Sequence, residues 1–92
     1  MGMFAMNLFE DTVNSLDDPK VKEFIVVLQN CAKAYKCKMR SFAIHKGVAF
    51  ISFDNDEIMR DLAADMQEMT GVRADICKNK EEFLRKAKKI IT

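Results

Sequence analysis

The chain has 92 residues, of which 49% are hydrophobic, and its formal net charge is +1. This composition argues against a disordered protein, and the small net charge gives no global attraction to nucleic acid or to a membrane surface. No apolar run reaches the roughly 20 residues that a membrane-spanning helix needs, and the apolar start lacks the basic region of a secretion signal. We therefore expect one cytoplasmic domain over residues 1–92.

The chain contains three cysteines, Cys31, Cys37 and Cys77. Their number is odd and their spacing matches no zinc-binding pattern. Cys31 falls on an apolar helical stripe, where a cysteine usually serves as a small buried hydrophobic residue. We therefore expect no metal site and no cofactor.

The first half of the chain shows two stretches with helical spacing of apolar residues. Residues 4–16 are the first, and they predict a helical arm (1–17) packed on the core. Asp18 and Pro19 then favour a new helix start, because aspartate caps helices and proline suits their first position. The predicted second helix covers residues 19–35.

This second helix has apolar residues on two sides. Val26, Val27 and Ala34 project from the side opposite its main apolar stripe. A helix that is apolar on two sides is usually covered on both. We expect either the helical arm or a second copy of the chain to cover these three residues.

Residues 39–53 alternate β-branched and aromatic residues on either side of Gly47, which predicts a β-hairpin. A three-residue loop, 45–47, with glycine in the left-handed conformation suits the common type I turn followed by a bulge. In this register one face of the hairpin carries Phe42, Ile44, Val48 and Phe50.

The second half predicts a helix, a strand and a final helix. The helix over 55–70 is capped by Asp54 or Asn55 and ends at Gly71. Residues 72–77 alternate as a half-buried strand, and residues 80–91 form the last helix. The predicted fold is a small α+β domain of order α-α-β-β-α-β-α. Its three-stranded mixed sheet consists of the antiparallel hairpin and one strand joined by a right-handed β-α-β crossover.

His45, the one histidine of the chain, lies at the tip of the predicted hairpin. Asp54 and Asp56 follow, and a hydrolase could use such a set. However, no second histidine and no nucleophile signature accompanies His45. We therefore predict no catalytic residues and a chain that is not an enzyme.

The predicted helix over 55–70 carries an acidic stripe, because four acids recur at helical spacing on one side of it. A solvated face would explain the stripe, and so would a docking surface for a basic protein partner. A divalent metal ion is less expected, since carboxylates one helical turn apart seldom complete a coordination sphere alone. The acidic stripe consists of Glu57, Asp61, Asp65 and Glu68.

A basic window follows the second predicted helix. No acid occurs between Phe24 and Phe53, and the same stretch supplies a candidate contact surface for phosphates. We identify no RNP1 sequence, GxxG loop or helix-turn-helix signature beside it. The candidate nucleic-acid contacts are Lys33, Lys36, Lys38, Arg40 and Lys46.

The run "KGVAFISFDNDEIMRDLAADM" followed by "VRADICKNKEEFLRKA" resembles the strand-helix-strand-helix tail of restriction-endonuclease-like domains. Those nucleases hold a metal ion with an Asp followed by a Glu-x-Lys. The chain contains no Glu-x-Lys. The resemblance therefore implies a catalytically empty copy of that fold.

Two functional hypotheses follow from these features. The leading one is a small non-enzymatic module for protein–protein interaction or self-association, with Val26 and Val27 buried in a homodimer. The alternative is a nucleic-acid-binding module that uses the basic residues of the 33–46 window. Neither hypothesis requires a cofactor or a membrane.

Overall fold

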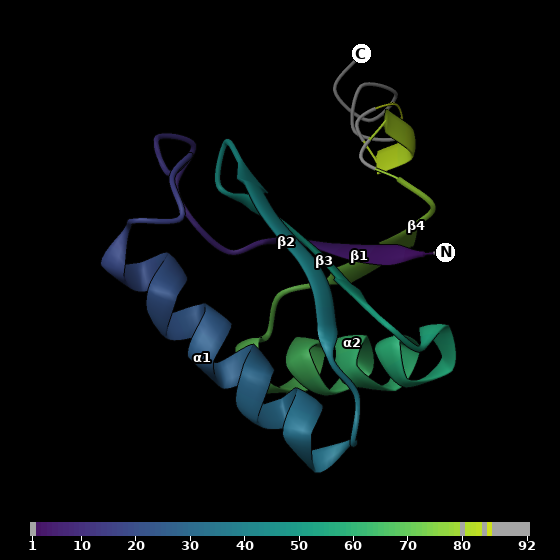
Figure 1. Cartoon of the computed structure of the whole chain (residues 1–92). Helices are drawn as coiled ribbons and strands as arrows, with labels where there is room; N and C mark the ends of the chain where they lie inside the picture. The colour runs from purple at the N-terminus through teal and green to yellow at the C-terminus, as the bar shows by residue number, and fades with distance from the viewer. Residues whose placement is uncertain (1, 80, 84, 86–92) are drawn as a thin grey trace.

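The computed structural model describes residues 2–79, 81–83 and 85, and Figure 1 shows its architecture. The elements are β1 (Met3–Asn7), α1 (Pro19–Ala34), β2 (Met39–His45), β3 (Val48–Phe53), α2 (Asp56–Thr70) and β4 (Ala74–Cys77). The strands form one sheet in the order β2-β3-β1-β4, and neighbouring strands are antiparallel. A β-α-β-β-α-β chain with this strand order has the ferredoxin-like arrangement.

Two helices cover one face of the sheet, and a smaller apolar cluster lies on the other. Helices α1 and α2 lie together on the same side of the sheet (Figure 1), and the main core fills the space between them and the strands. We call the opposite side the outer face. The helical residues that follow β4, 81–83 and 85, lie over this outer face. Its buried cluster consists of Ala5, Phe50 and Cys77, with Met3, Ala43, Val48 and Phe83 packed around it.

The predictions for the two long helices are confirmed. Asp18 caps α1 by accepting a hydrogen bond from the backbone N–H of Lys20 at 2.9 Å, and Pro19 is the first helical residue. Asn55 caps α2, and Gly71 ends it with a φ of 72°. These helix ends are set by local side-chain chemistry, which is why the sequence alone predicts them.

The predicted N-terminal helical arm is wrong. Met3–Asn7 is a central strand that pairs with β3 on one side and β4 on the other. Phe4 and Met6 pack under the helices while Ala5 is buried on the outer face. A strand buried on both faces has no apolar–polar alternation, so its short apolar run was open to a helical interpretation.

The central position of β1 also corrects the predicted sheet. β1 lies between β3 and β4, so the two strands of the predicted crossover are not neighbours. The sheet therefore has four strands and is antiparallel throughout, where three strands in a mixed sheet were expected. β3 and β4, the two strands of the run that resembles restriction-endonuclease-like domains, are therefore not paired with each other.

The hairpin is present, but its turn is tighter than predicted. His45 pairs with Val48, which leaves Lys46 and Gly47 as a two-residue turn with φ values of 48° and 78°. Positive φ at both central residues is the type I′ geometry, which matches the twist of the strands. The shorter turn moves Val48 and Phe50 to the outer face, because a one-residue change of register reverses every side chain.

The segment between β1 and α1 holds this turn in place. The backbone N–H of Phe9 donates to the carbonyl of Gly47 at 3.1 Å, and the N–H of Gly47 donates to the carbonyl of Val13 at 2.9 Å. The N–H of Lys46 donates to Oδ1 of Asn14 at 2.6 Å. The hairpin tip is therefore fixed against residues that lie more than thirty positions earlier.

The residues after β4 begin a helix as predicted. Asn79 accepts a hydrogen bond from the N–H of Glu82 at 2.8 Å, and Glu82 accepts one from the N–H of Lys78 at 2.9 Å. Phe83 is half-buried, and residues 80, 84 and 86–91 of the predicted helix lie outside the described residues. No helix in the described part of the chain has the length and apolar character to cross a membrane.

Candidate functional site: the outer face of the sheet

The outer face carries a polar hollow of about 320 Å³ at the end of the sheet where β2 begins. Ser41 and Ser52 lie opposite each other across the β2–β3 pair, and their hydroxyl oxygens are 2.5 Å apart. Arg40 is the extra residue of an irregularity in the β2–β3 ladder between Met39 and Ser41. The bulge adds a guanidinium to the two hydroxyls at one edge of the sheet. The hollow is lined by Gly2, Met3, Arg40, Ser41, Ser52 and Phe53.

The predicted basic window is divided into two parts. Lys33, Lys36 and Lys38 lie between the end of α1 and the start of β2, close in the chain to Arg40. Lys46 lies in the turn at the other end of β2, about 20 Å from Arg40 at the usual rise of a strand. Each of these side chains is exposed. The structure thus places positive charge at both ends of the β2 edge, and not in one compact patch.

Residues 46–53 are not a complete RNP1 sequence, because two positions depart from it, but they match the remaining positions of the RNP1 pattern. The pattern is K/R-G-F/Y-G/A-F-V-x-F/Y, and it lies on a strand of the four-stranded sheet in RNA-recognition modules. The chain reads "KGVAFISF" there, with valine at the third position and isoleucine at the sixth. The run begins in the hairpin turn and continues along β3, a central strand. The structural context of the pattern is therefore present.

The aromatic content of this surface is lower than the pattern requires. Of its two aromatic positions on the outer face, one is Val48 and the other is Phe50. Ala5 lies opposite Phe50 on β1, so the neighbouring strand supplies no second ring there. Phe50 is 2% exposed, and the ring of Phe83 meets it edge to face with centroids 5.4 Å apart. In this state the face offers polar groups and cations, while its one strand-borne ring is covered.

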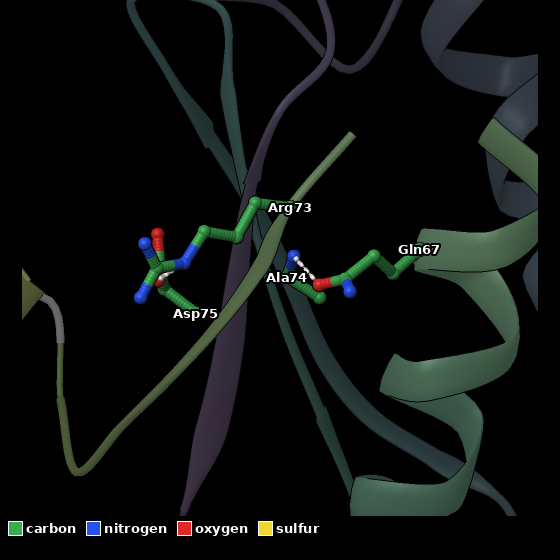
Figure 2. A network of polar contacts seen from close by, with 4 residues as sticks. All are labelled: Gln67, Arg73, Ala74 and Asp75. Atoms are coloured by element: carbon green, nitrogen blue, oxygen red, sulfur yellow. Dashed lines mark hydrogen bonds and ion pairs between the residues drawn. The ribbon is translucent and has the colours of Figure 1, made fainter. Parts of the chain in front are cut away.

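The β4 edge of the sheet differs from the β2 edge. Gln67 of α2 accepts a hydrogen bond from the backbone N–H of Ala74 at 3.0 Å (Figure 2). This N–H is therefore not available to pair with an additional strand at the β4 edge. On the side of β4 away from α2, Arg73 pairs with Asp75 at 2.8 Å (Figure 2). This ion pair neutralises the charge of Arg73 at the β4 edge.

The acidic stripe on α2 is linked to the basic window within the chain. Glu57, Asp61 and Glu68 are exposed, whereas Asp65 is half-buried and accepts a hydrogen bond from the hydroxyl of Tyr35. Tyr35 follows α1 directly and precedes Lys36, so this hydrogen bond joins one acid of the stripe to a residue within the basic window. In the described residues no ion pair joins the stripe to Lys33, Lys36 or Lys38.

We expect the hydroxyl of Tyr35 to titrate at unusually high pH. The hydrogen bond to Asp65, and then burial and the charges of Asp65 and Asp61, raise the pKa of Tyr35 from 10.0 to about 12. The pKa of Tyr35 is higher in the folded chain than in the unfolded chain, so this contact stabilises the fold below pH 10. Its contribution to stability is lost as the pH rises toward 12.

Tyr35 is the one tyrosine of the chain, and the chain has no tryptophan. The near-ultraviolet absorbance of tyrosinate, measured across a pH series, therefore reports on Tyr35 alone. Asp65→Ala should return the midpoint toward 10.0, the ordinary value, whereas Asp61→Ala, which removes a weaker influence, should lower it less. A wild-type midpoint at the ordinary value, in a protein still folded by circular dichroism, would contradict the contact.

The residues weighed for hydrolysis lie apart. His45 ends β2 beside the hairpin turn, while Asp54 and Asp56 follow β3 at the other end of the hairpin, about 20 Å away at the usual strand rise. Asp54 accepts a hydrogen bond from the N–H of Lys38 at 3.1 Å, and Asp56 accepts one from the N–H of Gly2 at 3.4 Å. Both acids thus accept hydrogen bonds from backbone N–H groups, and neither lies near His45.

The cysteines are free thiols, with Cys37 and Cys77 buried and Cys31 half-buried against the core. Burial, and to a lesser degree Asp54, raises the pKa of the Cys37 thiol. A thiol with a raised pKa is a weak nucleophile and a weak metal ligand at neutral pH. Within the described residues, no group of three His, Cys, Asp or Glu side chains could hold a metal ion.

The predicted self-association residues are exposed on α1. Val26 is 54% exposed and Val27 is 39% exposed, and Ala34 is exposed as well. The helical arm expected to cover them does not exist. Val27 borders a shallow apolar hollow beside the segment that follows β1, which Leu8, Phe9, Lys20, Glu23 and Phe24 also line.

No protein-family model, curated protein or solved structure matches this chain. Its function is therefore inferred from the residues of its own surfaces.

Proposed function

We propose that the chain is a small non-enzymatic module that binds single-stranded nucleic acid on the outer face of its sheet. The RNP1-type run on β3 carries this proposal, because its outward-facing Ser52 lines the same hollow as Arg40 and Ser41. Sheets of this kind bind single strands, whose bases can be splayed out, stacked and hydrogen-bonded.

The charges at the two ends of β2 suggest how a bound single strand of nucleic acid would lie on the sheet. Arg40 and Lys46 would each contact a phosphate, which positions the chain of nucleotides along the β2 edge. Between these contacts, Ser41 and Ser52 offer hydroxyls that can donate and accept hydrogen bonds at base edges. The net charge of +1 gives little long-range attraction, so we expect binding to be modest and to depend on this local surface.

Charge reversal at Lys46 tests this surface. Lys46→Glu should weaken binding to short labelled RNA and DNA of mixed sequence and lower the salt dependence by about one phosphate contact. The measurement is fluorescence anisotropy across a series of salt concentrations, with the RNA and DNA arms compared. Lys22→Glu is the matched control, since it makes the same charge change on α1, on the other side of the sheet. Equal weakening by both variants would show a nonspecific charge effect and would contradict the proposed surface.

Self-association through α1 is a second candidate, which the exposure of Val26 and Val27 favours. A homodimer would bury both valines against the same helix of a second copy, and such two-fold contacts are the commonest in oligomers. We expect sedimentation equilibrium to show a concentration-dependent dimer that Val26→Asp weakens at least about tenfold, because the substitution enters a two-fold interface twice. Leu16→Asp, at a site that is 46% exposed, should leave dimerisation unchanged. A monomer at every concentration would rule this candidate out.

A further inference from the structure

We propose that Phe83, together with residues 81 and 82 of the same helical turn, acts as a displaceable cover on the nucleic-acid surface, and that binding is regulated by moving this cover off Phe50. The inference rests on the proposed function and adds a mechanism of control to the same site.

The cover occupies the place that a stacked base would need. Phe50 is the outward-facing phenylalanine of the RNP1-type run, and bases stack on such rings. Phe83 packs on it at a centroid distance of 5.4 Å and an interplanar angle of 85°. Phe50 is left 2% exposed, and Cys77 beside it 3% exposed. A base and the Phe83 ring cannot both lie on Phe50, so intramolecular packing and nucleic-acid binding compete.

The hydrogen bonds of the cover favour its movement as a unit. The cap that joins Lys78, Asn79 and Glu82 is made within the segment itself, at 2.8 and 2.9 Å. Residues 81–83 are not part of the strand ladder, which ends at Cys77. Moving Phe83 away therefore removes side-chain packing but leaves the sheet and the helix cap intact. Segments of this kind open more easily than core strands do.

Removal of the Phe83 ring in the full chain tests this competition. We expect Phe83→Ala to bind labelled single-stranded RNA about two- to tenfold more tightly than the wild type, the range that an aromatic pair contributes. Phe50→Leu should bind more weakly than the wild type. Phe24→Ala is the control, because Phe24 is a half-buried phenylalanine on the helix side of the sheet and should leave affinity unchanged.

The outcomes separate the cover from the proposed function. If Phe50→Leu weakens binding and Phe83→Ala does not strengthen it, the cover is wrong while the nucleic-acid surface stands. If neither the wild type nor Phe83→Ala binds RNA or DNA, both the function and the cover are wrong.

Thiol labelling provides a readout that does not depend on nucleic acid. Cys77 lies in the cluster with Phe50 and Phe83, whereas Cys37 belongs to the main core. In Phe83→Ala, maleimide labelling followed by peptide mass analysis should show faster modification of Cys77 and an unchanged rate at Cys37. Equal acceleration at both cysteines would indicate general destabilisation and would overturn the assignment of Phe83 as a local cover.

Discussion

Gly47→Ala is expected to lower the free energy of unfolding by about 3 kcal/mol or more, the range of a strained backbone combined with a steric clash. Gly47 has a φ of 78°, a conformation that side chains with a Cβ atom rarely adopt. A Cβ atom there would lie 2.3 Å from the carbonyl oxygen of Phe9 and 2.6 Å from that of Glu10. These are backbone atoms, so no side-chain rotation can relieve the contact.

Gly71→Ala is the matched control for this substitution. Gly71 has a similar φ of 72°, but a Cβ atom there would meet nothing within 4 Å. We expect a loss of about 1–2 kcal/mol, the cost of the left-handed conformation alone. Guanidinium denaturation followed by far-ultraviolet circular dichroism gives both values. Equal losses of unfolding free energy in the two variants would show that the segment after β1 does not lie in close contact with the hairpin turn.

Phe4→Ala is expected to lower the free energy of unfolding by about 3–5 kcal/mol, the usual cost of removing a buried phenylalanine. Phe4 is fully buried, and its ring stacks on that of Phe53 with centroids 6.3 Å apart. Its strand lies between β3 and β4. A large loss is expected because the cavity would open in the middle of the sheet, where neighbouring strands cannot move inward independently.

The same denaturation measurement checks this value against Leu16→Ala. Leu16 is 46% exposed in the segment before α1, and we expect its replacement to change stability by no more than about 0.5 kcal/mol. If Phe4→Ala cost as little as Leu16→Ala, residues 3–7 would not form a central strand.

The extent to which the sequence predicted the fold depended on the range of the interactions involved. Helices α1 and α2 were predicted closely, because Asp18, Pro19, Asn55 and Gly71 set their ends through contacts within a few residues. β1 was missed, since its state is decided by pairing with strands more than forty residues away. The hairpin was predicted, but its register was wrong by one residue. A glycine suits both the predicted three-residue loop and the observed two-residue turn, and the positive φ of Lys46 that decides between them is not evident from its residue type.

The candidate site was predicted in its parts and not as a surface. Arg40 and Lys46 were chosen for their charge, but their positions at opposite ends of β2 follow from the sheet. The RNP1-type run was available in the sequence and acquires its significance from the central position of β3. The packing of Phe83 on Phe50 joins residues 33 positions apart, and no local pattern marks such a contact.

The measurement that tests the proposed function most directly is an NMR titration of the isotopically labelled chain with short single-stranded RNA at low salt. Binding on the outer face predicts amide shift changes at Ser41, Lys46 and Ser52, with the amides of Val26 and Val27 unchanged on the opposite side of the sheet. Shift changes confined to α1, or none at any RNA concentration, would contradict it.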